Sequence, residues 1–485
     1  MLLNLKINFN FMVVNPHIFR GYDIRGVVDK DLTPQIAYHI GRAYATFLQQ
    51  KKISQKAIVG RDCRLSSPAL AKALIKGITE GGVEVIDIGL TLVGMFYWSQ
   101  YFLNIRGGVM VTASHNPAEY NGFKLAIDFS ETMVSEQIQA IKQIIESQEY
   151  YSPPSPSSII SRSITQDYFQ DILRRFPRFN FRVVVDPSHS TPGAFIPELL
   201  RQAGCEVIEQ NTQIDGNFPL GTPDPTEQMV AERLAQAVVK RRADLGFSYD
   251  ADGDRIGVVT EKGEIIWNDL LVALLAADVL DKHPGATIMF NTLCSKVVTE
   301  TIIQRGGKPF MWRTGHSFLK KKNQEVGAAF IGELSGHFFF SQDFYNHDDG
   351  AYTTLRLLDY LARHKTTLSQ ALVDLPKYIS SPEIKIGCSE DKKADFIRKI
   401  SPRLRQDFPQ AEVIDDERAG DGVRLEMPTS MLVVRYSQNG PYLTIKFEAK
   451  DKEGYNKLKQ YLRKLLAQYP EIDWGYGVNL DSLNK

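Results

Sequence analysis

Apolar runs followed by short polar loops recur along the chain and determine its predicted architecture. Residues 109–111 read Val-Met-Val and lead into a polar turn at residues 112–117. Similar runs precede polar loops at residues 243–250 and 328–333. Apolar runs of this length, bounded by turn residues, are typical of buried strands. We therefore expect strands that end in functional loops. At the end of the first, Ser114 either faces a cleft or closes a local serine turn.

Helical periodicity alternates with these strands. Thr33-Pro34 opens a helix whose apolar face comprises Ile36, Ile40, Tyr44, Phe47 and Leu48. A strand at residues 57–60 leads through a polar loop to a helix that begins near Pro68 and ends at Gly81-Gly82. This alternation predicts an α/β fold. New strand-loop-helix series begin at residues 182–186 and 286–290, which indicates that one α/β unit is used three times.

Changes in composition suggest the domain boundaries. Residues 152–163 are rich in serine and proline, as linkers often are, and a second linker is expected near residues 377–382. Beyond it, two helices flank two strands, which predicts a small α+β domain. We expect three similar α/β domains with mixed sheets plus a C-terminal α+β domain around a central cleft. Their predicted bounds are residues 12–160, 161–265, 266–377 and 378–485.

Bulk composition limits the functional classes. The 485 residues, 43% hydrophobic and 24% charged, are too many for a single core. Lys plus Arg (57) equals Asp plus Glu (57), so no overall charge attracts nucleic acid or an anionic membrane. The longest basic run, Lys320-Lys321-Lys322, is interpreted as a solvated helix face. An anionic ligand would therefore need a local site.

Cysteine usage and the apolar segments bear on location. The four cysteines lie far apart and match no metal-binding spacing, which favours a reduced, cytoplasmic compartment. The sequence contains no apolar run of about 18 residues, the length that would suggest a membrane span. Residues 1–12 lack the small-residue cleavage site of a signal peptide, and Met12 is a second candidate start. We expect a monomer or small homo-oligomer without nucleic-acid or membrane partners.

Three alternating carboxylates form the strongest chemical signal. Asp250, Asp252 and Asp254 follow an apolar strand, and such carboxylates can converge on one hard cation, without which they would repel one another. The alternatives are a solvated acidic turn and a calcium-binding EF-hand loop. That loop requires glycine at its sixth position, where Arg255 stands, and helices on both sides, where strands are predicted. The sequence therefore predicts a Mg²⁺ site.

Two further loops give weaker signals. Glu333 and Ser335 lie between two glycines, and an extended loop would present both from one side, which suits vicinal sugar hydroxyls. A turn with a buried glutamate is the alternative. Residues 435–441 join two strands and contain Arg435, Ser437 and Asn439. They are typical either of an anion-binding loop or of an ordinary hairpin.

Residues 112–117, Thr-Ala-Ser-His-Asn-Pro, resemble the phosphoserine loop of the α-D-phosphohexomutases, the phosphomannomutase and phosphoglucomutase superfamily. Residues 18–26 resemble the amino-terminal signature of that family, and three later loops resemble its metal, sugar-binding and phosphate-binding loops in family order. The resemblance thus covers the chain from about residue 18. In the last loop, Asn439 and Gly440 replace the usual Thr and Glu, so a hydroxyl ligand for the distal phosphate is lost.

The resemblance implies a function. It implies a phosphohexomutase that interconverts hexose 6-phosphate and hexose 1-phosphate, of mannose, glucose or both, through phosphorylated Ser114 and a hexose 1,6-bisphosphate. Phosphoglucosamine mutase is the runner-up, disfavoured because the phosphate loop departs from that group's usual Ser-Gly-Thr-Glu-Pro. A non-catalytic sugar-phosphate binding protein is the alternative of another class, and it should have lost the serine or an aspartate.

The resemblance also implies roles for individual residues. Mg²⁺ would be held by Asp250, Asp252 and Asp254, with the Ser114 phosphoryl oxygen completing the site. Candidates for proton transfer or contact with the phosphoryl group are Lys124, His337, Arg25 and Arg255. Candidates for substrate binding are Tyr22, His316, Glu333, Ser335, Arg435, Ser437 and Asn439.

Overall fold

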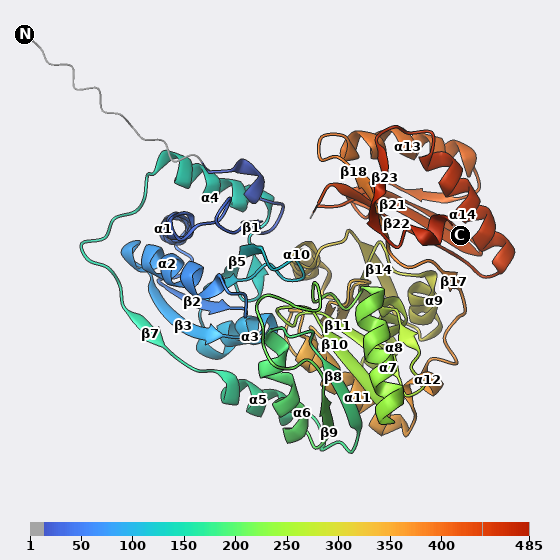
Figure 1. Cartoon of the computed structure of the whole chain (residues 1–485), viewed down its shortest axis with the longest axis horizontal. Helices are drawn as coiled ribbons and strands as arrows, with labels where there is room; N and C mark the ends of the chain where they lie inside the picture. The colour runs from blue at the N-terminus through green and yellow to red at the C-terminus, as the bar shows by residue number, and fades with distance from the viewer. Residues whose placement is uncertain (1–13, 439, 485) are drawn as a thin grey trace, which may run out of the picture. The chain divides into compact units, whose positions relative to one another are not determined.

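A computed structural model describes residues 14–438 and 440–484 (Figure 1). The chain divides into two compact units. The first comprises the residues up to Tyr168 together with Asp215–Thr222, and the second comprises Phe169–Ile214 and the residues from Pro223 onward. Of the residues singled out from sequence, Met12 and Asn439 lie outside the described residues.

The first unit is built on a mixed sheet. Its strands run in the order β1-β5-β4-β2-β3-β7, with β6 beside β5, and β2 is parallel to β3 and β4 while β5 is antiparallel to β4. The strands are β1 (Ile24–Val27), β2 (Lys56–Arg61), β3 (Glu84–Leu90), β4 (Gly107–Val111), β5 (Tyr120–Asp128), β6 (Glu131–Thr132) and β7 (Ile159–Ser161). The helices are η1 (Pro16–Ile18), α1 (Pro34–Gln50), α2 (Ser67–Glu80), α3 (Val93–Leu103) and α4 (Ser135–Ser147).

Helices cover both faces of this sheet. Because side chains alternate along a strand, Val109 and Val111 of β4 pack into one apolar cluster with α1, α2 and α4. Gly108 faces α3, where a Cβ atom would come within 2.8 Å of the Phe96 ring. The hydroxyl of Thr33 accepts the N–H of Ile36 at 3.2 Å and caps α1, so that helix begins where the sequence predicted.

The second unit contains two more mixed sheets. One runs β12-β11-β10-β8-β9 and the other β14-β13-β15-β16. Their strands are β8 (Arg182–Asp186), β9 (Glu206–Glu209), β10 (Leu245–Tyr249), β11 (Ile256–Thr260), β12 (Ile265–Ile266), β13 (Thr287–Asn291), β14 (Lys308–Trp312), β15 (Phe330–Gly332) and β16 (Phe338–Phe339). The helices of this part of the chain are α5 (Thr165–Leu173), η2 (Thr191–Ala194), α6 (Ile196–Gln202), α7 (Gln228–Arg241), α8 (Asn268–Lys282), α9 (Lys296–Gln304), α10 (His316–Val326), α11 (Gly350–His364) and α12 (Leu368–Ala371).

One pairing pattern occurs in all three sheets. A first strand (β2, β8 or β13) is parallel to the next two, and the third strand (β4, β10 or β15) is antiparallel to a fourth (β5, β11 or β16). The loop between the third and fourth strands carries Ser114, the three aspartates and Glu333, respectively. The predicted threefold use of one α/β unit, with the corresponding loop reused, is confirmed.

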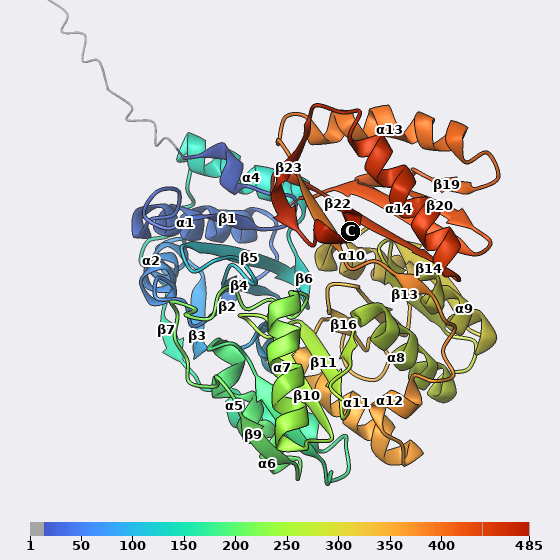
Figure 2. The same cartoon turned by 45° about the vertical axis from the view of Figure 1, so that its right-hand side comes forward.

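The last part of the chain forms an antiparallel sheet in the order β19-β20-β21-β22-β18-β23, with β17 beside β22. The helices α13 and α14 share one apolar core with it, as the predicted α+β pattern requires, and Figure 2 shows them beside its strands. Its elements are β17 (Ile379–Ser380), β18 (Ile384–Cys388), α13 (Lys393–Asp407), β19 (Glu412–Ile414), β20 (Gly422–Met427), β21 (Ser430–Tyr436), β22 (Tyr442–Ala449), α14 (Lys452–Leu466), β23 (Ile472–Val478) and α15 (Asp481–Asn484).

Two features of the fold differ from a simple partition by sequence. β7 extends the first sheet to Ser161, within the stretch read as a linker. Asp215–Thr222, which the sequence places among residues 161–265, packs with the first unit. Of the described helices, none is both long enough and apolar enough to cross a membrane.

Candidate active site

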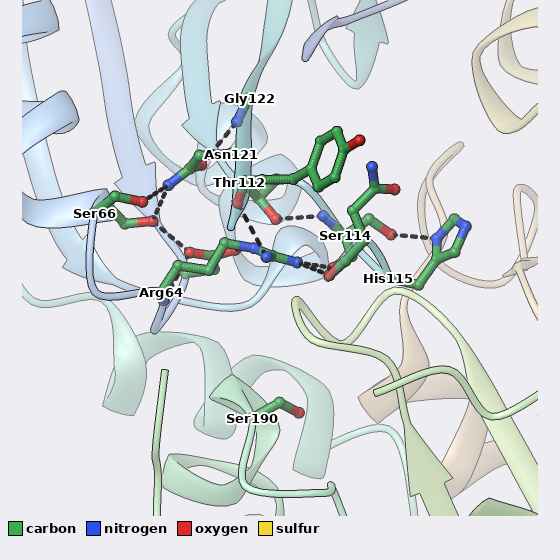
Figure 3. Close-up of polar contacts among 12 residues, drawn as sticks. Arg64, Ser66, Thr112, Ser114, His115, Asn121, Gly122 and Ser190 are labelled. Carbon is green, nitrogen blue, oxygen red and sulfur yellow. Dashed lines mark hydrogen bonds and ion pairs between the residues drawn. The ribbon is translucent and has the colours of Figure 1, made fainter. Parts of the chain in front are cut away.

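The loop after β4 holds Ser114 in a strained backbone conformation. Ser114 is 3% exposed and has a φ of 47°, in the left-handed region, which costs a residue other than glycine about 1–2 kcal/mol. Its N–H donates to the Thr112 hydroxyl at 2.9 Å (Figure 3), and Asn116 N–H donates to the Ala113 carbonyl at 3.0 Å. The Thr112 hydroxyl, rather than that of Ser114, therefore closes the local turn. Ser114 Oγ lies 3.2 Å from His115 Nδ1.

Three other predicted residues belong to the same unit. Arg25, on β1, donates to Asn116 Oδ1 at 2.8 Å and pairs with Asp23 at 2.5 Å. Lys124 is 2% exposed on β5, the strand between β1 and β4. Tyr22 is half-buried in the bend before β1. Neighbouring strands therefore bring two buried cations into the sheet whose loop carries the serine.

The aspartate loop joins β10 to β11, and strands flank it as the sequence predicted. Asp250, Asp252 and Asp254 are fully buried, and their carboxylate oxygens lie within 4.8 Å of one another. Asp250 Oδ1 accepts the N–H groups of Gly253 and Arg255 at 3.1 and 3.2 Å. Burial raises the pKa of the Asp250 carboxyl, and the charges of the other two aspartates raise it further. Three converging carboxylates of this kind fit a hard divalent cation.

His337 connects the aspartate loop to the glutamate loop. Its backbone pairs with that of Arg255, and Arg255 Nε donates to His337 Nε2 at 2.9 Å. His337 Nδ1 lies 2.7 Å from Asp348 Oδ2 and 3.5 Å from Asp254 Oδ1. Because Nε2 accepts a hydrogen bond, Nδ1 carries the imidazole hydrogen and lies next to both carboxylates.

Asp348 was not identified from sequence. It is fully buried, which alone would raise its pKa, but contact with His337 and the charges of Lys320 and His316 hold the pKa well below its usual range. The His316 ring stacks on that of His337, with centroids 5.1 Å apart. An ionised Asp348 therefore fixes the ring orientation of His337. The only signal in the sequence is an acidic pair directly before α11.

The interpretation of the basic run as a solvated face is wrong for one of its residues. Lys320 is 1% exposed, whereas Lys321 is exposed. The difference arises because helical periodicity turns Lys320 toward the protein interior, where its charge acts on Asp348. Consecutive lysines on a helix do not share one face.

Glu333 has one oxygen bound within the protein and one available to a ligand. Oε2 accepts the N–H of Gly315 at 3.1 Å and the side-chain amide of Asn291 at 3.4 Å. Oε1 is buried and makes no hydrogen bond to any described residue. Burial raises the pKa of the Glu333 carboxyl. A buried acceptor of this kind fits a ligand hydroxyl.

The expected extended geometry of this loop is wrong. Gly336 N–H donates to the Glu333 carbonyl at 3.0 Å, so residues 333–336 form a tight turn. Glu333 is consequently buried while Ser335 is half-buried. The glycine at position 336, with a φ of 96°, permits a bend that a spacing argument does not reveal.

The loop between β21 and β22 is fixed by two residues that sequence reasoning missed. Asp421 binds Arg435 through two contacts, Nε–Oδ1 at 2.9 Å and Nη2–Oδ2 at 2.6 Å. Lys393 Nζ donates to the carbonyls of Ser437 and Gly440 at 2.5 and 3.2 Å. The loop is thus a hairpin whose arginine is held in one orientation.

The predicted residues therefore fall into three sets. One connected set in the second unit contains the three aspartates, Arg255, His316, Glu333 and His337, with Ser335 beside Glu333. The C-terminal sheet holds Arg435 on β21, and Ser437 lies in the loop that follows β21. The first unit holds Tyr22, Arg25, Ser114 and Lys124.

Three family models match the chain in order. They are described as alpha/beta/alpha domains I, II and III of phosphoglucomutase/phosphomannomutase, and they match residues 16–152, 165–263 and 267–378. Together with the repeated sheet and its three loops, these matches define an α-D-phosphohexomutase.

Individual relatives agree over nearly the whole chain. A protein of Pseudomonas aeruginosa named phosphomannomutase/phosphoglucomutase is 40% identical over 453 residues, 93% of this chain and 95% of its own length. A phosphoglucomutase of Neisseria gonorrhoeae is 34% identical and covers 94% of this chain and 98% of its own. A solved phosphoglucomutase/phosphomannomutase family protein from Burkholderia thailandensis has a TM-score of 0.86 at 33% identity, covering 95% and 99% of the two chains. The chain belongs to the phosphoglucomutase/phosphomannomutase family.

Proposed function

We propose that this protein interconverts hexose 6-phosphate and hexose 1-phosphate through a phosphoserine and a hexose 1,6-bisphosphate. The observation that carries the proposal is the reuse of one loop in three α/β units, which supplies Ser114, the aspartate group and Glu333. The names of the relatives, which are phosphomannomutases, phosphoglucomutases or both, support it.

Ser114 would carry the phosphoryl group. In the first half-reaction, a hydroxyl oxygen of the hexose monophosphate bonds to phosphorus as the bond from phosphorus to Ser114 Oγ breaks, and the hydroxyl proton leaves to a base. The resulting bisphosphate turns around in the site. It then returns its other phosphoryl group to Ser114 by the reverse chemistry.

Asp250, Asp252 and Asp254 would hold Mg²⁺, together with an oxygen of the Ser114 phosphoryl group. When bound, Mg²⁺ supplies positive charge that stabilises the phosphoryl group in transfer. The shared burial of the three carboxylates supports this assignment, because their mutual repulsion needs a cation.

His337 is the base that the second unit supports best. Its Nε2 is occupied by Arg255 Nε in this arrangement, so it accepts a proton only when Arg255 shifts toward a substrate phosphoryl group. Asp348 would then stabilise the imidazolium through Nδ1. Lys124 and Arg25 would instead neutralise charge at the serine loop.

Substrate binding would be divided between loops. Glu333 Oε1 and Ser335 would bind the sugar hydroxyls at C3 and C4, with His316 and Tyr22 contacting the ligand. Arg435, Ser437 and Asn439 would bind the phosphate that is not reacting. Because mannose and glucose differ only at C2, a site that binds shared hydroxyls should accept both.

Intact-protein mass spectrometry and a coupled assay test the proposal. We expect an added phosphoryl group on Ser114 after incubation with glucose 1,6-bisphosphate, and turnover of glucose 1-phosphate and mannose 1-phosphate. Exclusive turnover of glucosamine phosphates would instead favour phosphoglucosamine mutase. Binding without phosphorylation or turnover would indicate a sugar-phosphate binding protein.

Location and assembly complete the proposal. None of the four cysteines forms a disulfide in the part of the chain that the structure describes, which supports a cytoplasmic location. A monomer or small homo-oligomer is tested by size-exclusion chromatography with light scattering.

A further inference from the structure

Arg64 contacts most of the backbone around Ser114. Its guanidinium is fully buried, with Nη2 donating to the carbonyls of Ser114 (2.6 Å) and Asn116 (2.7 Å). Nη1 donates to the carbonyls of Pro117 (2.6 Å) and Tyr120 (3.1 Å). One side chain therefore satisfies three carbonyl groups of the turn that joins β4 to β5 and the carbonyl of Tyr120, the first residue of β5.

Asp62 fixes the position of Arg64. It is fully buried, and its Oδ2 accepts Arg64 Nε at 3.1 Å while Oδ1 accepts Arg64 N–H at 3.1 Å. Oδ1 also accepts the Ser67 hydroxyl at 2.5 Å, and Ser67 in turn accepts the Asn121 amide at 2.9 Å. The guanidinium thus has one orientation, set by a charged partner and by the first residues of β5.

Phe218 covers the guanidinium. Its ring centroid lies 5.0 Å from the Arg64 guanidinium carbon, and Phe218 is 5% exposed. The chain here approaches the Arg64 loop so closely that a Cβ on Gly216 would lie 2.5 Å from the Cys63 carbonyl. The ring therefore keeps water from the hydrogen bonds of Arg64, which strengthens them.

We propose that Arg64 is a positioning residue for phosphoryl transfer. It holds the left-handed backbone of Ser114, so Ser114 Oγ leaves the turn in one direction, and Phe218 maintains the dry surroundings that this requires. The proposal rests on the proposed function, because it concerns the direction in which Ser114 presents its hydroxyl for phosphoryl transfer. A misplacement of about 1 Å in a reacting group can lower turnover about 10²-fold.

Arg64→Lys tests the proposal. Lysine keeps the charge but presents its donors from one nitrogen, so it cannot reach four carbonyls. We expect kcat per phosphorylated Ser114 to fall about 10²-fold, with KM for glucose 1-phosphate within about threefold of wild type. Counting phosphorylated serine by intact mass ensures that unfolded protein does not mimic the effect.

Hydrogen exchange supplies a readout that does not depend on turnover. We expect amide exchange in residues 112–121 to rise about tenfold in Arg64→Lys, since the turn loses its main donor. Arg106→Lys is the matched control, because Arg106, just before β4, forms a half-exposed pair with Asp128 at the end of β5, far along both strands from the Ser114 turn. That variant should leave both kcat and loop exchange unchanged.

Each outcome decides one question. Suppose that the wild type turns over and that Arg64→Lys has kcat and loop exchange within about threefold of wild type. That result would overturn the role of Arg64 and leave the proposed function intact. Absence of wild-type turnover would overturn the proposed function, while loop exchange still decides whether Arg64 holds the turn. If Arg64→Lys does not fold, Phe218→Leu takes its place, and unchanged loop exchange and turnover there would overturn the proposal.

Discussion

The contact between Asp348 and His337 gives the sharpest prediction about chemistry. Asp348→Asn keeps the shape of the side chain and removes its charge. In the wild type, His337 Nδ1 lies 2.7 Å from a carboxylate oxygen of Asp348. The asparagine can turn its amide N–H₂ toward Nδ1, and Nδ1 would then have to accept, with the imidazole hydrogen on Nε2. The hydrogen on Nε2 would then face the N–H of Arg255 Nε, which lies 2.9 Å from Nε2 in the wild type, and the hydrogen bond between them would be lost.

A hydrogen bond to a charged partner contributes about 1.5–3 kcal/mol. If His337 becomes charged during proton transfer, this energy is lost from the transition state, and kcat should fall about 10- to 150-fold. KM should change little, because Asp348 is assigned no contact with the sugar or its phosphates. A coupled assay with glucose 1-phosphate measures both quantities.

Asp349→Asn is the matched control, since Asp349 caps α11 by accepting Tyr352 N–H at 2.9 Å and asparagine caps equally well. Its kcat should stay near that of wild type. An Asp348→Asn enzyme that folds and keeps kcat within about threefold of wild type would refute the assignment of His337 as a base oriented by Asp348.

The remaining predictions concern the other loops. Ser114→Ala should lower turnover about 10³-fold or more and abolish phosphorylation by intact mass, so near-normal activity free of wild-type contamination would exclude Ser114 as the phosphoryl carrier. Asp252→Asn should lower activity about as much as EDTA does, without adding to it, and full activity in excess EDTA would rule out the metal role. For Glu333→Gln, the melting temperature of the variant minus that of wild type should increase as the pH rises from acid to neutral. Burial raises the pKa of Glu333, so folded wild type retains a proton that the unfolded chain releases, and the stability of wild type falls as the pH rises. A difference in melting temperature between variant and wild type that decreases with pH would contradict this. Mannose 1-phosphate and glucose 1-phosphate should react with efficiencies within about 100-fold, less than about 3 kcal/mol, and Glu333→Ala should impair both; a preference above about 1,000-fold would require a C2 contact.

Much of the fold was predictable because its signals are local. Thr33 caps α1 where a helix was expected, and the apolar runs before Ser114, Asp250 and Glu333 are the third strands of the three repeated units. These residues can be identified from the sequence because each follows an abrupt change from apolar to polar side chains. Strand ends of this kind need no knowledge of distant contacts.

The supporting residues could not be predicted in the same way. Asp348 acts on His337, Asp421 on Arg435 and Arg64 on the backbone of Ser114, and in each case the chain between them is long or folded back. A single aspartate or arginine in sequence has no pattern that reveals its partner. The turn at Glu333 was missed for a related reason, because the hydrogen bond that closes it depends on the bend at Gly336.

The discontinuity of the first unit constrains how the chain folds during synthesis. Domains usually fold in order as they leave the ribosome. Here the ring that covers Arg64 belongs to Phe218, so the first sheet and its helices emerge before the residue that completes their interior. We expect a nascent chain ending near Tyr168 to have its sheet formed while the Ser114 turn still exchanges with solvent. The turn should become ordered only after Asp215–Thr222 has been made, so the serine acquires its final geometry while the second unit is being translated.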